Sequence, residues 1–307
     1  MTTNYTLRPL NPTEDFPALV ELINLSAQEE TEELATTEEE QRSLAELPGH
    51  DPEKDTWVAV AADDTFLGYA DVWRPPETSG ATLSLTVHSE YRQQGIGRAL
   101  LEQAQTRARD LGATALEVYA APEDPRTLEW LKARGFSLGG AYRSMTAELG
   151  DVPNPALPTG FTLHTFEEVW NETVLANAIE QGHAGLFGHN AVTEAGLETL
   201  LEAFDFENIL LLFDAEGEVA GYCKFAPLEE GEGYLDAPGV VPEQRRPELY
   251  RALATAALQQ LQVQECDFVT LESWGDSDEV IEVYRGLGFD LEHTLLGFTL
   301  PLTSGTA

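Results

Sequence analysis

The sequence is poor in cysteine and lysine, and it has no long apolar run. Its 307 residues include two cysteines, Cys223 and Cys266, which are too few for a disulfide framework. No stretch approaches the roughly 20 apolar residues of a membrane span, and the start MTTNYTLRPL lacks the apolar core of a signal peptide. We therefore expect a soluble cytoplasmic protein whose length suits two domains, each large enough to bury a core.

Basic residues are also scarce, and the resulting negative charge is unevenly distributed. Residues 1–150 carry a net charge of −14 and residues 151–307 one of −23, within a total of −37. Such a field repels nucleic acid and anionic membranes and attracts cations. Two interpretations stay open for this charge. One is solubility, including solubility in a salt-rich cytosol, and the other is recognition of a cationic acceptor such as an amine. The same choice applies to the glutamate-rich stretch 29–40, as a solvated helix face or as part of an acceptor site.

The stretch 85–101, read as LTVHSEYRQQGIGRALL, predicts a strand, a glycine loop and a helix in succession. Gly95 and Gly97 are separated by one residue, which lets backbone N–H groups approach a ligand without obstruction by Cβ atoms. The start of the helix adds unpaired donors and the positive end of its dipole. Arg92 and Arg98 add positive charge on either side, so the loop is suited to a phosphate or pyrophosphate.

Two common phosphate-binding motifs do not match this loop. No Lys-Ser/Thr follows the second glycine, as a nucleoside-triphosphate loop requires, and the third glycine of the dinucleotide fingerprint is missing. The loop resembles motif A of the GNAT acetyltransferases, Arg/Gln-x-x-Gly-x-Gly/Ala. The context fits that resemblance, because Leu-Thr-Val precedes the arginine by five residues and Trp-Leu-Lys-Ala-Arg-Gly-Phe stands at 130–136, where the family has a late helix and a closing Gly-Phe.

Periodicity and turn residues predict a mixed α/β sheet. Strands are expected at 5–10, 81–87 and 115–120, and a hairpin at 56–62 and 65–73; helices are expected from Phe16, at 37–47, along the glycine-loop helix and at 124–134. Thr37 with Glu40 three residues on is the pattern of a capping box. A final strand or hairpin is expected at 136–149. The glycine loop then lies at the end of a central strand, where α/β sheets bind ligands.

An internal repeat covers most of the chain. A shift of 153 residues aligns the two halves without a gap from the hairpin to the last strand, placing Arg92 on Arg245 and Gly135-Phe136 on Gly288-Phe289. We therefore expect two tandem GNAT acetyltransferase-like domains, at 1–150 and 159–307, joined by a proline-rich linker at 151–158.

The two halves diverge at the residues that matter for chemistry. Gly95 and Gly97 become Glu248 and Tyr250 in the second half, and these should oppose a pyrophosphate by charge and by steric closure. Yet only the second half has Tyr284, in a segment that resembles a family signature whose tyrosine often protonates the leaving thiolate. The first half has Leu131 at that position. The first half is therefore expected to hold the cofactor, and the second half is not.

The resemblance implies direct attack of an amine on the thioester of acetyl-CoA in the first domain. The residues implied in cofactor binding are Leu85, Thr86, Val87, Arg92, Gln93, Gln94, Gly95, Ile96, Gly97, Arg98 and Asp124. The family commonly has an asparagine at the position of Asp124. The backbone N–H near Val87 would polarise the thioester carbonyl. Glu117 and Tyr119 are the candidates for proton transfer through water, although plain strand residues are the alternative interpretation of both.

Three functions remain open at this level. The chain is interpreted as an N-acetyltransferase that acts on a small-molecule or peptide amine, with acetyl-CoA as co-substrate and no metal. The alternatives are a non-catalytic acyl-CoA-binding sensor, which the missing tyrosine and base would suit, and a pseudoenzyme that binds a cationic partner. No nucleic-acid or membrane partner is expected, and the sequence leaves a monomer and a homodimer equally open.

Overall fold

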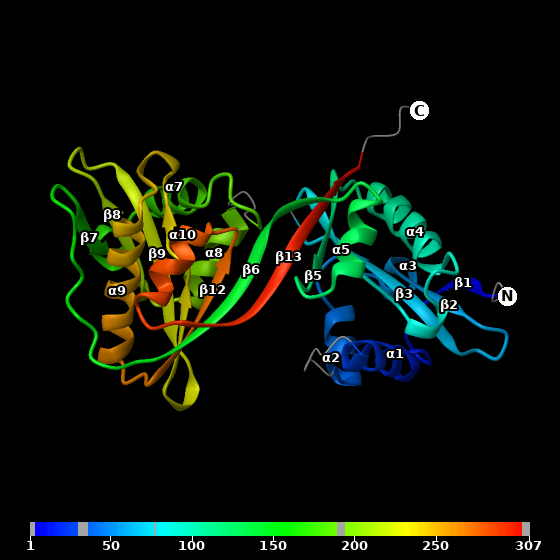
Figure 1. Cartoon of the computed structure of the whole chain (residues 1–307). Helices are drawn as coiled ribbons and strands as arrows, with labels where there is room; N and C mark the ends of the chain where they lie inside the picture. Colours follow the sequence, from blue (N-terminus) through cyan, green and yellow to red (C-terminus); the bar gives the residue numbers. More distant parts are fainter. Residues whose placement is uncertain (1–3, 30–35, 77, 189–193, 303–307) are drawn as a thin grey trace. The chain divides into compact units, whose positions relative to one another are not determined.

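The computed structural model describes residues 4–29, 36–76, 78–188 and 194–302 (Figure 1). The chain divides into two compact units. Unit 1 comprises residues 1–138 and 298–307, and unit 2 comprises residues 139–297. No described helix is both long and apolar enough to cross a bilayer.

Unit 1 is a mixed sheet with helices on both faces. Its strands lie in the order β1-β2-β3-β4-β5, followed by the last residues of β13 (Asp290–Pro301), and β4 and β5 are parallel. The other elements of unit 1, in chain order, are β1 (Thr6–Pro9), α1 (Phe16–Glu29), α2 (Glu38–Ala45), α3 (Pro52–Asp55), β2 (Thr56–Val60), β3 (Phe66–Trp73), β4 (Gly80–Val87), η1 (Ser89–Tyr91), α4 (Ile96–Asp110), β5 (Ala115–Ala120) and α5 (Pro125–Lys132).

Alternation along β3 assigns the helices to opposite faces of this sheet. Tyr69 packs with Phe16 and Leu19 of α1 in one buried cluster. Its neighbour Gly68 faces the other way, because a Cβ added there would lie 3.2 Å from the Leu100 side chain of α4. Figure 1 accordingly shows α4 on one side of the strands and α1 with α2 on the other.

Unit 2 repeats this plan. Its strands lie in the order β13-β6-β12-β10-β9-β8-β7, with β11 paired to β9. The elements are β6 (Ser137–Glu148), β7 (Thr162–Thr165), α6 (Phe166–Val169), α7 (Glu172–Gly182), α8 (Glu194–Ala203), η2 (Phe206–Asn208), β8 (Ile209–Phe213), β9 (Val219–Pro227), η3 (Glu229–Gly231), β10 (Glu232–Asp236), β11 (Gly239–Val240), η4 (Pro242–Gln244), α9 (Pro247–Val263), β12 (Phe268–Trp274) and α10 (Asp278–Arg285).

The element bounds confirm the repeat that the sequence predicted. Strand β8 repeats β2, helix α10 repeats α5, and β13 repeats β6, and in each pair both ends are displaced by 153 residues. The predicted mixed α/β sheet and the capping box of Thr37 and Glu40 on α2 are likewise confirmed.

The compact units differ at their ends from the domains expected at 1–150 and 159–307. Strand β6 follows unit 1 in sequence, yet from residue 139 onward it belongs to unit 2, where it pairs antiparallel with β12. Conversely, residues 298–302 belong to unit 1, where the Leu302 N–H donates to the Thr114 carbonyl at 2.8 Å. Unit 2 thus includes most of β6 from the first half of the sequence, and unit 1 includes the end of β13, from Phe298 onward, from the second half. Because β6 and β13 are repeats of each other, the side-chain pattern of either strand is compatible with the sheet of either unit.

Candidate active site

Strands β4 and β5 of unit 1 separate as they approach the glycine loop. Their parallel ladder spans three residue pairs and ends where Thr82 pairs with Glu117. Beyond that point β4 continues to Val87 and β5 to Ala120, and within this fully described stretch they pair with each other no further. The result is a gap between two central strands at the carboxyl end of the sheet, where α/β sheets bind ligands.

The backbone of β4 presents N–H groups to this gap. In an antiparallel pair, alternate residues direct their N–H groups at the partner strand. The His88 N–H donates to the Leu67 carbonyl of β3 at 2.9 Å, so the Thr86 N–H also faces β3. Leu85 and Val87 therefore direct their N–H groups toward the gap. Backbone N–H groups presented in this way can stabilise a developing oxyanion.

The loop after β4 has the backbone conformation expected of a phosphate cradle. Gln93 (φ +62°) and Gly95 (φ +90°) both adopt left-handed conformations, and α4 begins immediately at Ile96. A Cβ added at Gly95 would meet no atom within 4 Å, so the space over this residue is open. A Cβ at Gly97 would lie 3.4 Å from both Trp130 and Val87. Open space above a helix N-terminus can be occupied by a diphosphate.

The other predicted cofactor residues have more varied roles. The Arg92 Nε donates to the Val87 carbonyl at 3.0 Å, and Arg245 makes the same contact with Val240 in unit 2, so this brace is common to both halves. The exposed Arg98 pairs with Glu102 at 2.9 Å.

Three further residues of the predicted set contribute in different ways. The Ile96 side chain is buried, which leaves its backbone to face a ligand. Gln94 contacts the Glu90 carbonyl at 3.4 Å. Asp124 caps α5 by accepting the N–H groups of Arg126 and Thr127. Burial alone would raise the pKa of Asp124, but the side-chain and backbone hydrogen bonds of Thr127, together with the N–H and the charge of Arg126, lower it.

Two side chains that lie next to the loop, Trp130 and Arg134, were not among the predicted cofactor residues. Trp130 lies against Gly97, and the Arg134 guanidinium stacks over its ring at 4.0 Å. Within the described residues the buried Nε of Arg134 has no hydrogen-bond partner. Burial, and then the positive charge of Arg98, lower the pKa of Arg134. Two neighbouring cations beside a helix N-terminus would be stabilised by a bound anion. The only signal for them was the segment Trp130 to Phe136.

The two catalytic candidates lie on β5, where the Glu117 carboxylate is directed back toward the start of β4 and Tyr119 lies beyond the last paired residue. Glu117 occupies the last paired position of β5, and its carboxylate lies 3.0 Å from where a Cβ of Gly80 would be. Burial raises its pKa, as a general base near neutral pH requires. Tyr119 follows two residues later on the same face, and burial and then the charge of Glu117 raise its pKa to about 12. Tyr119 therefore keeps its proton at neutral pH.

In unit 2 the glycine loop is replaced by helix. By the repeat, α4 should correspond to a helix that begins at Leu249, but α9 begins two residues earlier, at Pro247. Pro247 has no N–H to offer an anion. Glu248 is exposed in the first turn, and Tyr250, in place of Gly97, is 2% exposed. Unit 2 therefore lacks the open turn that unit 1 has.

Tyr284, the tyrosine of the family signature, is enclosed in the core of unit 2. It is fully buried, and its hydroxyl donates to Asp276 Oδ2 at 3.2 Å. Ser273 Oγ donates to the same oxygen at 2.8 Å. Burial, and then the charge of Asp276, raise the pKa of Tyr284 well above its usual value. The hydroxyl is thus committed to a buried hydrogen bond.

A gap between strands with inward N–H groups and a glycine loop at one end is suited to an acyl thioester that carries a diphosphate. The acetyltransferase (GNAT) family matches residues 16–136 and 177–289. The chain belongs to this family, as the resemblance implied, and is an N-acetyltransferase of GNAT type; the family uses acetyl-CoA as its co-substrate and transfers acetyl groups to amines.

Similar proteins include two enzymes named mycothiol acetyltransferase. That of Pseudarthrobacter chlorophenolicus is 30% identical over 265 residues, covering 80% of this chain and 77% of the relative. That of Paenarthrobacter aurescens is 30% identical over 259 residues, covering 78% and 75%.

Two solved structures share the fold over nearly the whole chain. A GCN5-related N-acetyltransferase from Sphaerobacter thermophilus has a TM-score of 0.73 at 22% identity, covering 98% of this chain and 96% of that one. A tandem GNAT protein from the clavulanic acid biosynthesis pathway has a TM-score of 0.59 at 20% identity, covering 98% and 100%. The tandem arrangement is therefore found in a solved structure as well.

Proposed function

We propose that unit 1 carries the active site and that unit 2 is catalytically silent. The observation that supports this most directly is the contrast between the two equivalent turns. In unit 1, Gly95 is left-handed with open space above it. In unit 2, the equivalent Glu248 lies inside a helix that begins with proline. A diphosphate needs free N–H groups at a helix start, and they are available in unit 1.

The proposed reaction is direct transfer of acetyl from acetyl-CoA to a primary amine. The N–H groups of Leu85 and Val87 face the gap and would stabilise the oxyanion that forms when the amine attacks the thioester carbonyl. Glu117 would take the proton from the incoming ammonium through bridging waters, because its raised pKa brings it closer to neutrality while its carboxylate lies back along β4 from Val87. Tyr119, which stays protonated, would donate to the departing thiolate.

We infer that the acceptor approaches from the sheet face opposite α4. The diphosphate site lies at the N-terminus of α4, on the face that Gly68 and Leu100 share. The opposite face carries Thr82 and Glu117, and Ser84 on it is exposed although its strand is internal to the sheet. The names of the two mycothiol acetyltransferase relatives support a small-molecule acceptor. The chain's net charge of −37 favours a cationic one.

A thiol-release assay tests this function. Purified protein is incubated with acetyl-CoA and a panel of primary amines, and free coenzyme A is measured against time. We expect amine-dependent release, and we expect it to disappear when Gly95 is replaced by Glu. The equivalent change in unit 2, Glu248→Gly, is the matched control and should leave the rate unchanged.

Two other outcomes would favour different functions. Tight coenzyme A binding with no turnover on any amine would point to the acyl-CoA sensor. Absence of any coenzyme A binding would point to the pseudoenzyme.

A further inference from the structure

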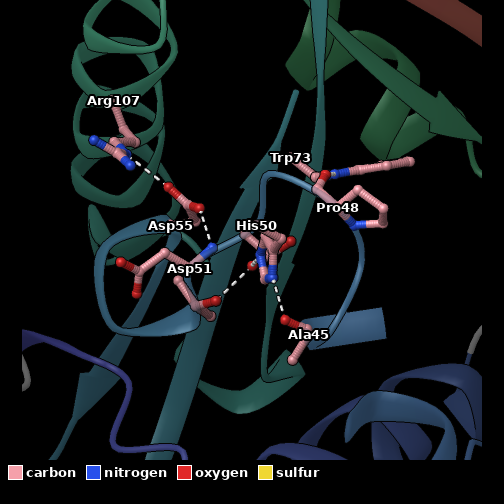
Figure 2. A network of polar contacts seen from close by, with 9 residues as sticks. Ala45, Pro48, His50, Asp51, Asp55, Trp73 and Arg107 are labelled. Carbon is pink, nitrogen blue, oxygen red and sulfur yellow. Dashed lines mark hydrogen bonds and ion pairs between the residues drawn. The ribbon is translucent and has the colours of Figure 1, made fainter. Parts of the chain in front are cut away.

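A polar network on the acceptor face of unit 1 is not used by the proposed reaction. It centres on His50, between α2 and α3, and on Asp71 of β3 (Figure 2). The strand register places Asp71 opposite the exposed Ser84 and beside Trp73, which pairs with Thr82. The Asp71 carboxylate is therefore on the same face as Glu117 and keeps a quarter of its side chain exposed.

His50 is held by acceptors on both sides of its ring. Its Nδ1 lies 3.1 Å from the Ala45 carbonyl and its Nε2 lies 3.0 Å from Asp71 Oδ1. Because a carbonyl and a carboxylate can only accept, both ring nitrogens must carry protons, which makes the ring an imidazolium. Burial alone would lower the pKa of His50, but the hydrogen bond and the charge of Asp71, helped by the Ala45 carbonyl and the charge of Asp55, raise it. The side chain is 4% exposed, so solvent competes little for these bonds.

The residues around His50 fix its position. Trp73 Nε1 donates to the Pro48 carbonyl at 3.1 Å, which ties the loop before His50 to β3. After His50, the Asp51 N–H donates to the buried Asp55 at 2.6 Å, and Arg107 of α4 pairs with the same carboxylate at 2.6 Å. Figure 2 shows these contacts on either side of the ring. The imidazolium is thus held in a loop that is braced at both ends.

Asp71 is in turn held by one of its two oxygens. Both His50 Nε2 and the buried Thr56 Oγ1 donate to Oδ1, the latter at 2.5 Å. Two donors on Oδ1 fix the plane of the carboxylate and leave Oδ2 able to accept from a ligand. Val87 lies three positions after Ser84 on β4, which is about 10 Å along a strand. Asp71 is therefore too far from the thioester to contact the transferred amine directly.

We propose that His50 is a positioning residue that locks Asp71 to accept a hydrogen bond from a second polar donor of the acceptor, an ammonium or hydroxyl remote from the transferred amine. This inference rests on the proposed acetyl transfer in unit 1. It assigns the enzyme a polyfunctional amine as its substrate class. It also predicts that loss of either residue weakens acceptor binding while the chemical step and acetyl-CoA binding persist.

Three matched amines test the proposal: hexylamine, 6-amino-1-hexanol and 1,6-diaminohexane. Steady-state kcat and KM are measured for each with saturating acetyl-CoA. The wild-type protein should prefer the two bifunctional amines. Asp71→Asn and His50→Gln should raise KM for these two by about tenfold or more, the loss expected for a hydrogen bond to a charged group, with little change in kcat. Values for hexylamine should stay the same.

Controls separate this role from a structural one. His164→Gln removes a histidine that faces Glu168 at 3.4 Å on unit 2, and it should change nothing. Unfolding temperature and coenzyme A affinity of each variant are measured alongside, and ¹⁵N NMR should show a doubly protonated His50 ring at pH 7.5. An equal loss for all three amines, unchanged selectivity in both variants, or a neutral His50 ring would overturn the proposal. If the wild type turns over no amine at all, the proposed function itself fails and this inference with it.

Discussion

Replacing Gly95 by glutamate should abolish useful cofactor binding while the fold survives. Gly95 has φ +90°, so any L-residue there costs about 1–2 kcal/mol of backbone strain. No atom lies within 4 Å of an added Cβ, so no clash adds to that cost. A carboxylate about 5 Å from a phosphate charge costs about 3 kcal/mol at an effective dielectric of 20. That penalty corresponds to roughly a hundredfold weaker binding.

Calorimetric titration with coenzyme A measures this penalty, and two further variants isolate its origin. Gly95→Ala introduces the strain without the charge, so it should weaken binding far less than Gly95→Glu. Gln103→Glu adds the same charge two turns along α4, beyond the screening length at physiological salt, and should bind like the wild type. High salt should narrow the gap between the Glu and Ala variants. Wild-type affinity in Gly95→Glu would refute the assignment of the phosphate site.

Three further predictions concern single side chains. Glu117→Gln should lower kcat/KM by about a hundredfold. It should also flatten the acidic limb of the pH profile of kcat/KM, because wild-type activity should rise with pH as the Glu117 carboxyl, whose pKa is raised, ionises. An unchanged acidic limb would exclude Glu117 as the base. Tyr284→Phe should leave kcat within about twofold of the wild-type value. It should lower the free energy of unfolding by about 1–3 kcal/mol, because Asp276 loses a buried hydrogen-bond donor. A large loss of turnover would mean that unit 2 contributes chemistry. Burial raises the pKa of Asp276 from 3.8 to about 6 against the bonds from Ser273 and Tyr284, so this carboxyl stabilises the fold fully below pH 3.8 and loses that contribution as pH rises through 6. In urea unfolding, the stability of Asp276→Asn relative to the wild type should therefore increase by up to about 3 kcal/mol as the pH rises from about 4 to about 7. A stability difference that does not change with pH would contradict the assignment.

Elements that local chemistry determines were predictable from the sequence. Strand β5 was expected at 115–120 and spans those residues, because buried Leu116, Val118 and Ala120 alternate with half-buried residues that include Glu117 and Tyr119. The capping box of α2 depends on two side chains three residues apart, and it forms as expected. The glycine loop was recognisable because its function depends on the absence of side chains.

Features that depend on distant residues were not predictable. The exchange of β6 and β13 between the units leaves no local trace, because two repeated strands fit either sheet equally well. His50 and Asp71 are 21 residues apart in the chain, and no motif links them. Tyr284 had the sequence context of a catalytic acid, yet eight residues earlier Asp276 accepts its hydroxyl inside the core. Contacts between separate elements, which a pattern does not specify, determine these roles.

The central claim is that this chain binds one acetyl-CoA, in unit 1. A crystal structure of the full chain with coenzyme A tests it most directly. The account predicts one cofactor per chain, with its diphosphate on the backbone of Gly95 to Gly97 and its pantetheine arm between β4 and β5. A diphosphate at the start of α9 in unit 2, or cofactors in both units, would contradict it.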